Sequence, residues 1–102
     1  MLTAILLAIS CVALGCVVVA LLGADNIINW FRGFFTNRNR IKNPSEIAFT
    51  LKEKLSNGNV KIVQGVFCQK TDQIEDGIQY EAEQLDKDLE AIHEDEDLVI
   101  YE

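Results

Sequence analysis

An apolar run near the start of the chain limits what the protein can fold into. Residues 2–23, LTAILLAISCVALGCVVVALLG, contain no charged residue, proline, Asn or Gln. A helix of this length extends about 33 Å, and the hydrocarbon core of a bilayer is about 30 Å thick. A chain of 102 residues has room for one small domain at most, which leaves little to cover a helix that is apolar all round. The sequence therefore predicts a transmembrane helix over residues 1–24.

A cleaved signal peptide is the main alternative for this run. Such a peptide has a basic start, a shorter apolar core and small residues at its cleavage site. Met1–Thr3 lacks a charged side chain, and Leu22 stands where a small residue is required. A lipoprotein interpretation of Ala13–Cys16 also fails, because no basic region precedes it. We therefore expect the segment to stay on the protein.

Small residues recur within the run at a helical spacing. Ala4, Ala8, Cys11 and Gly15 are four, three and four positions apart, so on a helix they share one face. Such a face lets a second backbone approach closely in lipid, where packing drives helix association. The alternative is that small residues are simply common in membrane helices. We expect this face to mediate helix packing in the membrane.

Charge changes along the chain in a way that orients a membrane protein. Residues 1–24 carry no charge, and residues 71–102 hold thirteen acidic residues against one lysine. Basic residues resist translocation, and they all follow the apolar run. We therefore expect a single-pass membrane protein with its N-terminus outside and its acidic C-terminal domain in the cytoplasm. The acidic balance would repel phosphate and excludes nucleic acid as a partner.

Residues 25–43 combine aromatic and basic side chains beside the apolar run. One helical face carries Ile27, Phe31, Phe34 and Phe35, with Trp30 at its edge. We expect these rings at the membrane surface, with anionic headgroups contacted by the basic residues Arg32, Arg38, Arg40 and Lys42. The alternative is an aromatic belt that ends one continuous tilted helix. Both interpretations place this segment at the membrane interface.

Residues 44–102 are expected to form a small acidic domain. The apolar residues Ile47, Phe49, Leu51 and Leu55 fall on alternate positions, as on one face of a strand. Asn57-Gly58 is a strong turn signal, and VKIVQGVF continues with β-branched residues, which together favour a β-hairpin. A helix over residues 45–56 is the alternative, because Asn43 can cap it and Gly58 can end it. Three lines of pattern therefore favour strands here, and the helical alternative stays open.

The acidic C-terminal third contains a helical stripe. Ile78, Ala82, Leu85, Leu89 and Ile92 are spaced four, three, four and three. The sequence LVIY at residues 98–101 is typical of a closing strand, whereas a disordered acidic tail should lack both features. The predicted fold class is α+β: a single N-terminal transmembrane helix, then a cytoplasmic domain of a β-hairpin, one amphipathic helix and a C-terminal strand.

Residues able to carry chemistry are few. His93 lies in the run HEDED, where one imidazole among flexible carboxylates would give an open metal site without defined geometry. The simpler interpretation is a solvated charge run, so no metal ligand is assigned. Cys68 lacks an obvious orienting group, and no phosphate-binding glycine loop is present. We expect neither an enzyme nor a cofactor.

Three functions are compatible with these sequence features. The first is a membrane-anchored interaction or adaptor module, an accessory subunit of a larger assembly that binds the anionic bilayer and either a protein partner or a second copy of itself. The second is a membrane-active, toxin- or holin-like protein that associates through the face from Ala4 to Gly15. The third is a metal-binding sensor at the His93 cluster.

Overall fold

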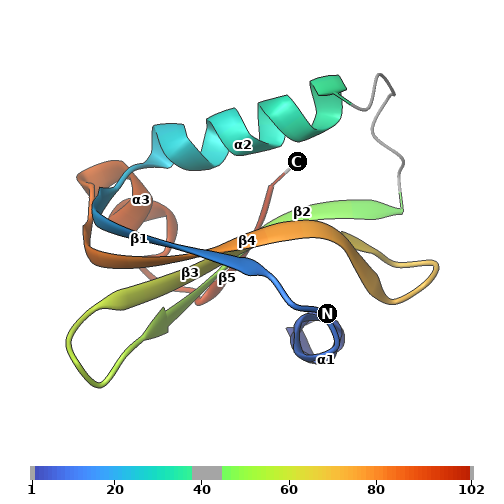
Figure 1. Ribbon diagram of the computed structural model, residues 1–102, viewed down its shortest axis with the longest axis horizontal. Helices are drawn as coiled ribbons and strands as arrows, with labels where there is room; N and C mark the ends of the chain where they lie inside the picture. Colours follow the sequence, from blue (N-terminus) through green and yellow to red (C-terminus); the bar gives the residue numbers. More distant parts are fainter. Residues whose placement is uncertain (1, 38–44, 102) are drawn as a thin grey trace.

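The chain folds around one β-sheet with a helix on each face. The computed structural model describes residues 2–37 and 45–101. Within these ranges the strands are β1 (Gly15–Leu22), β2 (Glu46–Lys54), β3 (Val60–Cys68), β4 (Gln73–Leu85) and β5 (Leu98–Tyr101), and the helices are α1 (Leu2–Ser10), α2 (Ala24–Asn37) and α3 (Lys87–Ile92). The strand order is β1-β4-β3-β2-β5, with β1 parallel to β4 and the other neighbours antiparallel. Figure 1 shows α2 along one face of the sheet and α1 against the other.

The N-terminal apolar run divides into a helix and a strand, so the predicted transmembrane helix over residues 1–24 is wrong. Ser10 ends α1, and its hydroxyl donates to the carbonyl oxygen of Leu7 at 2.6 Å. The β-branched Val17–Val19 then favour the extended backbone of β1. Among the residues that the structure describes, no helix is long and apolar enough to cross a membrane. The predicted single-pass localisation, with the acidic domain in the cytoplasm, is wrong for the same reason.

The sheet covers part of the apolar run, although so short a chain was expected to leave the run uncovered. On the face beneath α2, Leu22 of β1 and its neighbour Leu85 of β4 are both buried in the larger core cluster. On the opposite face, Ile5 of α1 is buried against Phe49 and other residues of the central strands. Ile5 and Ala8 of α1 are thus buried against the sheet, whereas Leu22 is the one buried residue of β1. The predicted membrane helix with a separate small domain is therefore replaced by one five-stranded α+β domain.

The hairpin expected around Asn57-Gly58 is present. β2 and β3 pair in antiparallel register from Glu46 opposite Cys68 to Lys54 opposite Val60, so the helical alternative for residues 45–56 is wrong. Gly58 has φ +91, a conformation that favours glycine. The backbone N–H of Leu55 donates to the carbonyl oxygen of Asn59 at 2.9 Å and closes the turn.

The helix predicted from the stripe Ile78–Ile92 is wrong over most of its length. Residues 73–85 form the long strand β4, which pairs with β1 on one side and β3 on the other. Ile78, Tyr80 and Ala82 also alternate with a period of two, and all three pack in the cluster beneath α2. Only the short α3 is helical, and the expected closing strand is β5.

Two polar contacts fix α2 and α3 to the sheet. The buried Gln64 of β3 donates from Nε2 to the carbonyl oxygen of Ile27 at 2.6 Å and accepts from the hydroxyl of Tyr80 at 3.2 Å. Asp86 caps α3, accepting from the backbone N–H of Leu89 at 2.8 Å, and its other oxygen accepts from the N–H of Ala24 at 3.3 Å. The start of α2 is thereby joined to the end of β4.

Candidate interaction site

Exposed apolar side chains gather in the N-terminal segment. Of the ten large apolar residues that are exposed within the described ranges, seven lie between residues 2 and 21: Leu2, Leu6, Leu7, Val12, Val17, Val18 and Leu21. No charged residue interrupts this segment. Apolar surface that gathers in one place, unlike single exposed residues, marks a binding site on a folded protein. The N-terminal segment is therefore the candidate interaction surface of the domain.

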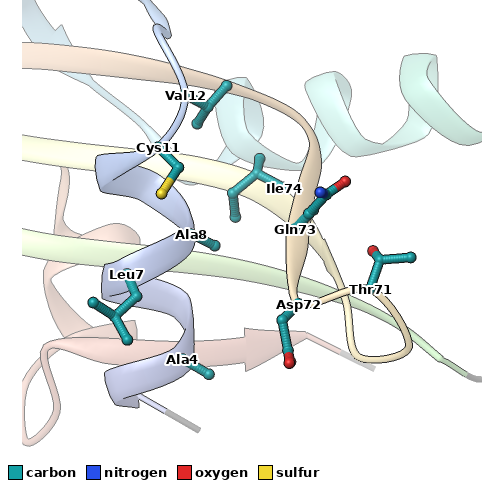
Figure 2. A pocket seen from close by; sticks show the side chains of 9 residues that line it. All are labelled: Ala4, Leu7, Ala8, Cys11, Val12, Thr71, Asp72, Gln73 and Ile74. Carbon is teal, nitrogen blue, oxygen red and sulfur yellow. The ribbon is translucent and has the colours of Figure 1, made fainter.

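A pocket lies between α1 and the turn that joins β3 to β4. It encloses about 570 Å³ and is lined by Ala4, Leu7, Ala8, Cys11, Val12, Thr71, Asp72, Gln73 and Ile74. Figure 2 shows the two alanine side chains of α1 directed across the gap towards the turn. The volume lies in the range of protein ligand sites, which are mostly apolar with a few placed polar groups. Here Thr71, Asp72 and Gln73 supply those groups from one wall.

The packing of α1 on the sheet forms one wall of the pocket, and the backbone of the β3–β4 turn forms the other. On one side, Ile5 and Ala8 are buried against the sheet, which leaves Leu7 exposed towards solvent. On the other side, Asp72 occupies the left-handed region at φ 54, where Asp is one of the better tolerated residues. The N–H of Gln69 donates to the carbonyl oxygen of Ser45 at 2.9 Å and ties the turn to the start of β2.

A cysteine adjoins the turn wall. Cys68 ends β3, and hydrogen bonds from the side chain and backbone of Thr71, followed by the backbone N–H of Lys70, lower the pKa of its thiol. Donors that point at a sulfur stabilise its thiolate form. Thr71 therefore contacts Cys68 and also lines the pocket. Cys11, on the opposite wall, is exposed.

The edge of the sheet next to α1 is also apolar. β1 pairs with β4 on one side, and in the described residues no strand pairs with its other side. Val18 is 74% exposed and Leu21 is 54% exposed. An edge strand presents backbone N–H and C=O groups in a row, which makes it a template for another strand.

The aromatic residues expected at a membrane surface pack largely within the domain. Phe31 and Phe34 are buried beneath α2, with Trp30 and Phe35 partly buried beside them, and the rings of Trp30 and Phe34 stack at 5.7 Å. Arg32 is exposed on the outer side of α2. Arg38, Arg40 and Lys42 lie outside the described residues. The predicted apolar face exists, and in this structure it covers the sheet.

The residues expected to pack helices together are divided between elements. Ala4 and Ala8 belong to α1, Cys11 follows it and Gly15 begins β1, so the four do not share one helical face. Ala4, Ala8 and Cys11 all line the pocket. The small side chains leave space against the β3–β4 turn, because they reach only a short way from the backbone.

His93 is buried within a chain of hydrogen bonds. Its Nε2 lies 2.8 Å from Oγ1 of Thr50, and its Nδ1 lies 3.0 Å from the carbonyl oxygen of Glu96. Both ring nitrogens are thus engaged by the protein itself. In the part of the chain that the structure describes, no three His, Cys, Asp or Glu side chains are grouped as a metal site requires. The two hydrogen bonds account for the burial of His93 without a metal ion.

Sequence reasoning missed the polar residues that matter most in the fold and the site. Gln64 and Thr50 are buried within apolar strands, and Thr71–Gln73 form the turn wall of the pocket. A polar residue inside an apolar strand is a signal that could have identified Gln64, because a buried amide requires partners. Nothing local to the turn points to α1, which lies about sixty residues earlier.

Comparison with protein-family models, curated proteins and solved structures finds no match for this chain.

Proposed function

We propose that this protein is a non-enzymatic interaction module whose pocket receives an apolar side chain of a basic partner protein. The observation that carries the proposal is the pocket of about 570 Å³ between α1 and the β3–β4 turn, within the segment that exposes most of the large apolar side chains. Binding interfaces commonly centre on an aromatic or aliphatic anchor that fills a pocket of the partner.

The lining supports an apolar anchor with a polar neighbour. Ala4, Leu7, Ala8, Val12 and Ile74 offer apolar contacts, and a buried large side chain gains roughly 1.5–3 kcal/mol over an exposed one. Thr71, Asp72 and Gln73 face this surface from a single side. A partner residue that enters the pocket can therefore place its own backbone or an adjacent side chain against these polar groups.

Charge supports a basic partner. The chain has a formal net charge of −7, and thirteen of its acidic residues follow position 70. Asp72 brings one of these carboxylates to the pocket. Complementary potentials steer association and disfavour partners of the same sign. A segment with lysine or arginine next to an aromatic or aliphatic residue fits these conditions best.

Site-specific photo-cross-linking tests the proposal in the native cell. A photoreactive phenylalanine analogue replaces Leu7, which is 64% exposed at the pocket, in the full-length chain. We expect an adduct with another protein upon irradiation. A second substitution, Ala4→Trp, fills the pocket and should remove most of this adduct, while circular dichroism verifies that the variant folds.

A second exposed apolar position controls for nonspecific cross-linking. Ile92 is an apolar residue of α3 with 38% exposure, and it lies outside the pocket. The same analogue at Ile92 should give little or no adduct. Equal yields at Leu7 and Ile92, or an adduct at Leu7 that survives Ala4→Trp, would contradict the proposed docking site.

A further inference from the structure

The two edges of the sheet differ in length and in charge. Within the described residues, β5 is four residues long and follows the acidic run Glu94–Asp97. β1 is eight residues long and carries neither a charge nor a proline. Proteins prevent the edge strands of their sheets from pairing with another chain by shortening these strands or by placing charges and prolines on them. β5 has such protection, whereas β1 does not.

Charge decides which occupant suits β1. A partner drawn by the net charge of −7 would dock on the acidic surfaces, because β1 offers it no opposite charge. Two copies of the chain repel one another over most of their surface. Residues 1–24 are the one long stretch of the sequence without a charged side chain, so two copies can meet there without juxtaposing like charges.

We infer that β1 pairs with β1 of a second copy in antiparallel register, so that the two sheets become one continuous sheet. Such a contact is isologous, since each copy presents the same strand to the other. It uses residues 15–21 and does not depend on the pocket of the proposed function. A two-fold axis normal to the sheet places one residue of β1 opposite itself.

Val18 is the residue on that axis. Leu22 at the end of β1 is buried in its own core, and its carbonyl oxygen accepts from the N–H of Asp86 at 2.9 Å. The residues left for pairing are 15–21, whose centre is Val18. Among the residues that the structure describes, Val18 is also the most exposed large apolar side chain, at 74%.

Side-chain sizes match in this register. Leu21, which is 54% exposed, lies opposite Gly15 of the second copy, where there is no side chain to meet. Cys16 lies opposite Ala20 of the second copy, and Val17 lies opposite Val19. No pair in this register therefore brings two leucines together, and the central pairs join valines, which are β-branched and favour strands.

Acidic residues on the next strand do not oppose the contact. Glu81 lies beside Val18 on β4, and its carboxylate accepts from the amide of Asn59 at 2.9 Å. The two copies of Glu81 would be three strand spacings apart, about 14 Å. This separation exceeds the Debye length of about 8 Å at physiological salt, so their repulsion is largely screened.

Sedimentation velocity with the full chain tests the inference. Over roughly 1–100 μM, we expect a particle of about 23 kDa, twice the 11.4 kDa of one chain, that dissociates on dilution. Val18→Lys places two ammonium groups on the axis and should raise the dissociation constant by at least about tenfold. Ile100→Lys, at a 40% exposed apolar residue of the other edge strand β5, should leave it unchanged.

A disulfide test reports the register. Directly opposed residues of antiparallel strands have Cα atoms about 4.5–5.5 Å apart, within the range that a disulfide can span. Under mild oxidation, Val18→Cys should therefore form an interchain disulfide between the introduced thiols, identified by peptide mass spectrometry. The native Cys16, which faces Ala20 of the second copy, should not link to its counterpart.

The outcomes separate this inference from the proposed function. A wild-type chain that stays monomeric at all concentrations overturns the inference, as does a dimer that Val18→Lys leaves intact. An absence of disulfide between the introduced thiols overturns the register. None of these results alters the expected adduct at Leu7, so the pocket can be correct where the dimer is wrong.

Discussion

Nε2 of His93 lies 2.8 Å from Oγ1 of Thr50, and both side chains are buried. Nδ1 of His93 faces the carbonyl oxygen of Glu96, which can only accept, so Nδ1 carries a proton and the neutral ring accepts at Nε2. The hydroxyl of Thr50 must then donate to His93. Its oxygen accepts from the hydroxyl of Tyr101, 2.7 Å away. One directed chain of hydrogen bonds thus joins β5, β2 and the end of α3.

This chain makes stability depend on pH. Burial lowers the pKa of His93, and nearby Lys52 adds to this, while backbone hydrogen bonds to Glu96 and Asp97 and the Asp97 carboxylate act in the opposite direction. The unfolded chain therefore takes up a proton at higher pH than the folded one. Stability from the neutral ring is fully present above about pH 6.5 and falls as the pH decreases below it.

Chemical denaturation at about pH 7.5 and about pH 5.5, where carboxylates stay ionised, measures this effect. The free energy of unfolding should fall between the two values in the wild type. His93→Gln should show a smaller fall, because the titrating ring is gone. An equal fall in both proteins would show that other groups cause the dependence.

Replacement of Gln64 should loosen α2. Gln64→Ala removes the donor to the carbonyl oxygen of Ile27 and the acceptor for the buried hydroxyl of Tyr80, and it leaves a cavity in β3. We expect a loss of about 2–3 kcal/mol in unfolding free energy. Gln84→Ala, at an exposed position of β4, should change it by less than about 0.5 kcal/mol. Equal effects at the two sites would contradict a pinning role for Gln64.

Two glycines should respond in opposite directions to alanine. A Cβ at Gly23 would lie 2.7 Å from Oδ2 of Asp86 and would displace the carboxylate that caps α3. Gly23→Ala should therefore destabilise the protein by about 1 kcal/mol. A Cβ at Gly33, within α2, meets nothing within 4 Å, and Gly33→Ala should stabilise it by up to about 1 kcal/mol. Thermal unfolding followed by circular dichroism would reveal the order of the two variants, and the reverse order would count against this packing.

The reactivity of Cys68 should depend on Thr71. Thr71→Val removes the side-chain hydrogen bond that contributes most to the lowered pKa of the Cys68 thiol, so less thiolate is present near neutral pH. Alkylation of Cys68 by iodoacetamide should become slower, with labelling of the exposed Cys11 unchanged. Peptide mass spectrometry resolves the two rates. Thr36→Val, at an exposed position of α2, provides the control and should alter neither.

Local signals in the sequence predicted local structure. Asn57-Gly58 predicted the β2–β3 turn, and LVIY predicted β5, because both signals reside in a few adjacent residues. The face of Ile27, Phe31 and Phe34 was also identified, although it was assigned to a membrane surface. Its contact with the sheet depends on strands that follow it in the chain. A helical face alone does not specify what covers it.

Long-range pairing explains the predictions that were wrong. Gly15 of β1 lies beside Ile78 of β4, and a partner so distant in sequence leaves no trace near either residue. Ile78 and Ala82 fit a helical spacing and an alternating one equally well, so pairing on both sides of β4 decided the outcome. The pocket escaped prediction for the same reason. Ala4 and Ala8 were identified as a set, but the turn wall comes from Thr71–Ile74, more than sixty residues later in the chain.

The domain, the pocket and the free edge of the sheet all depend on the pairing of β1 with β4. Nuclear Overhauser effects between backbone protons of the isotope-labelled protein test this pairing. We expect extended chemical shifts over residues 15–22 and contacts that join Val17 to Tyr80 and Val19 to Ala82. Continuous helical shifts over residues 2–23, without contacts to β4, would contradict this pairing.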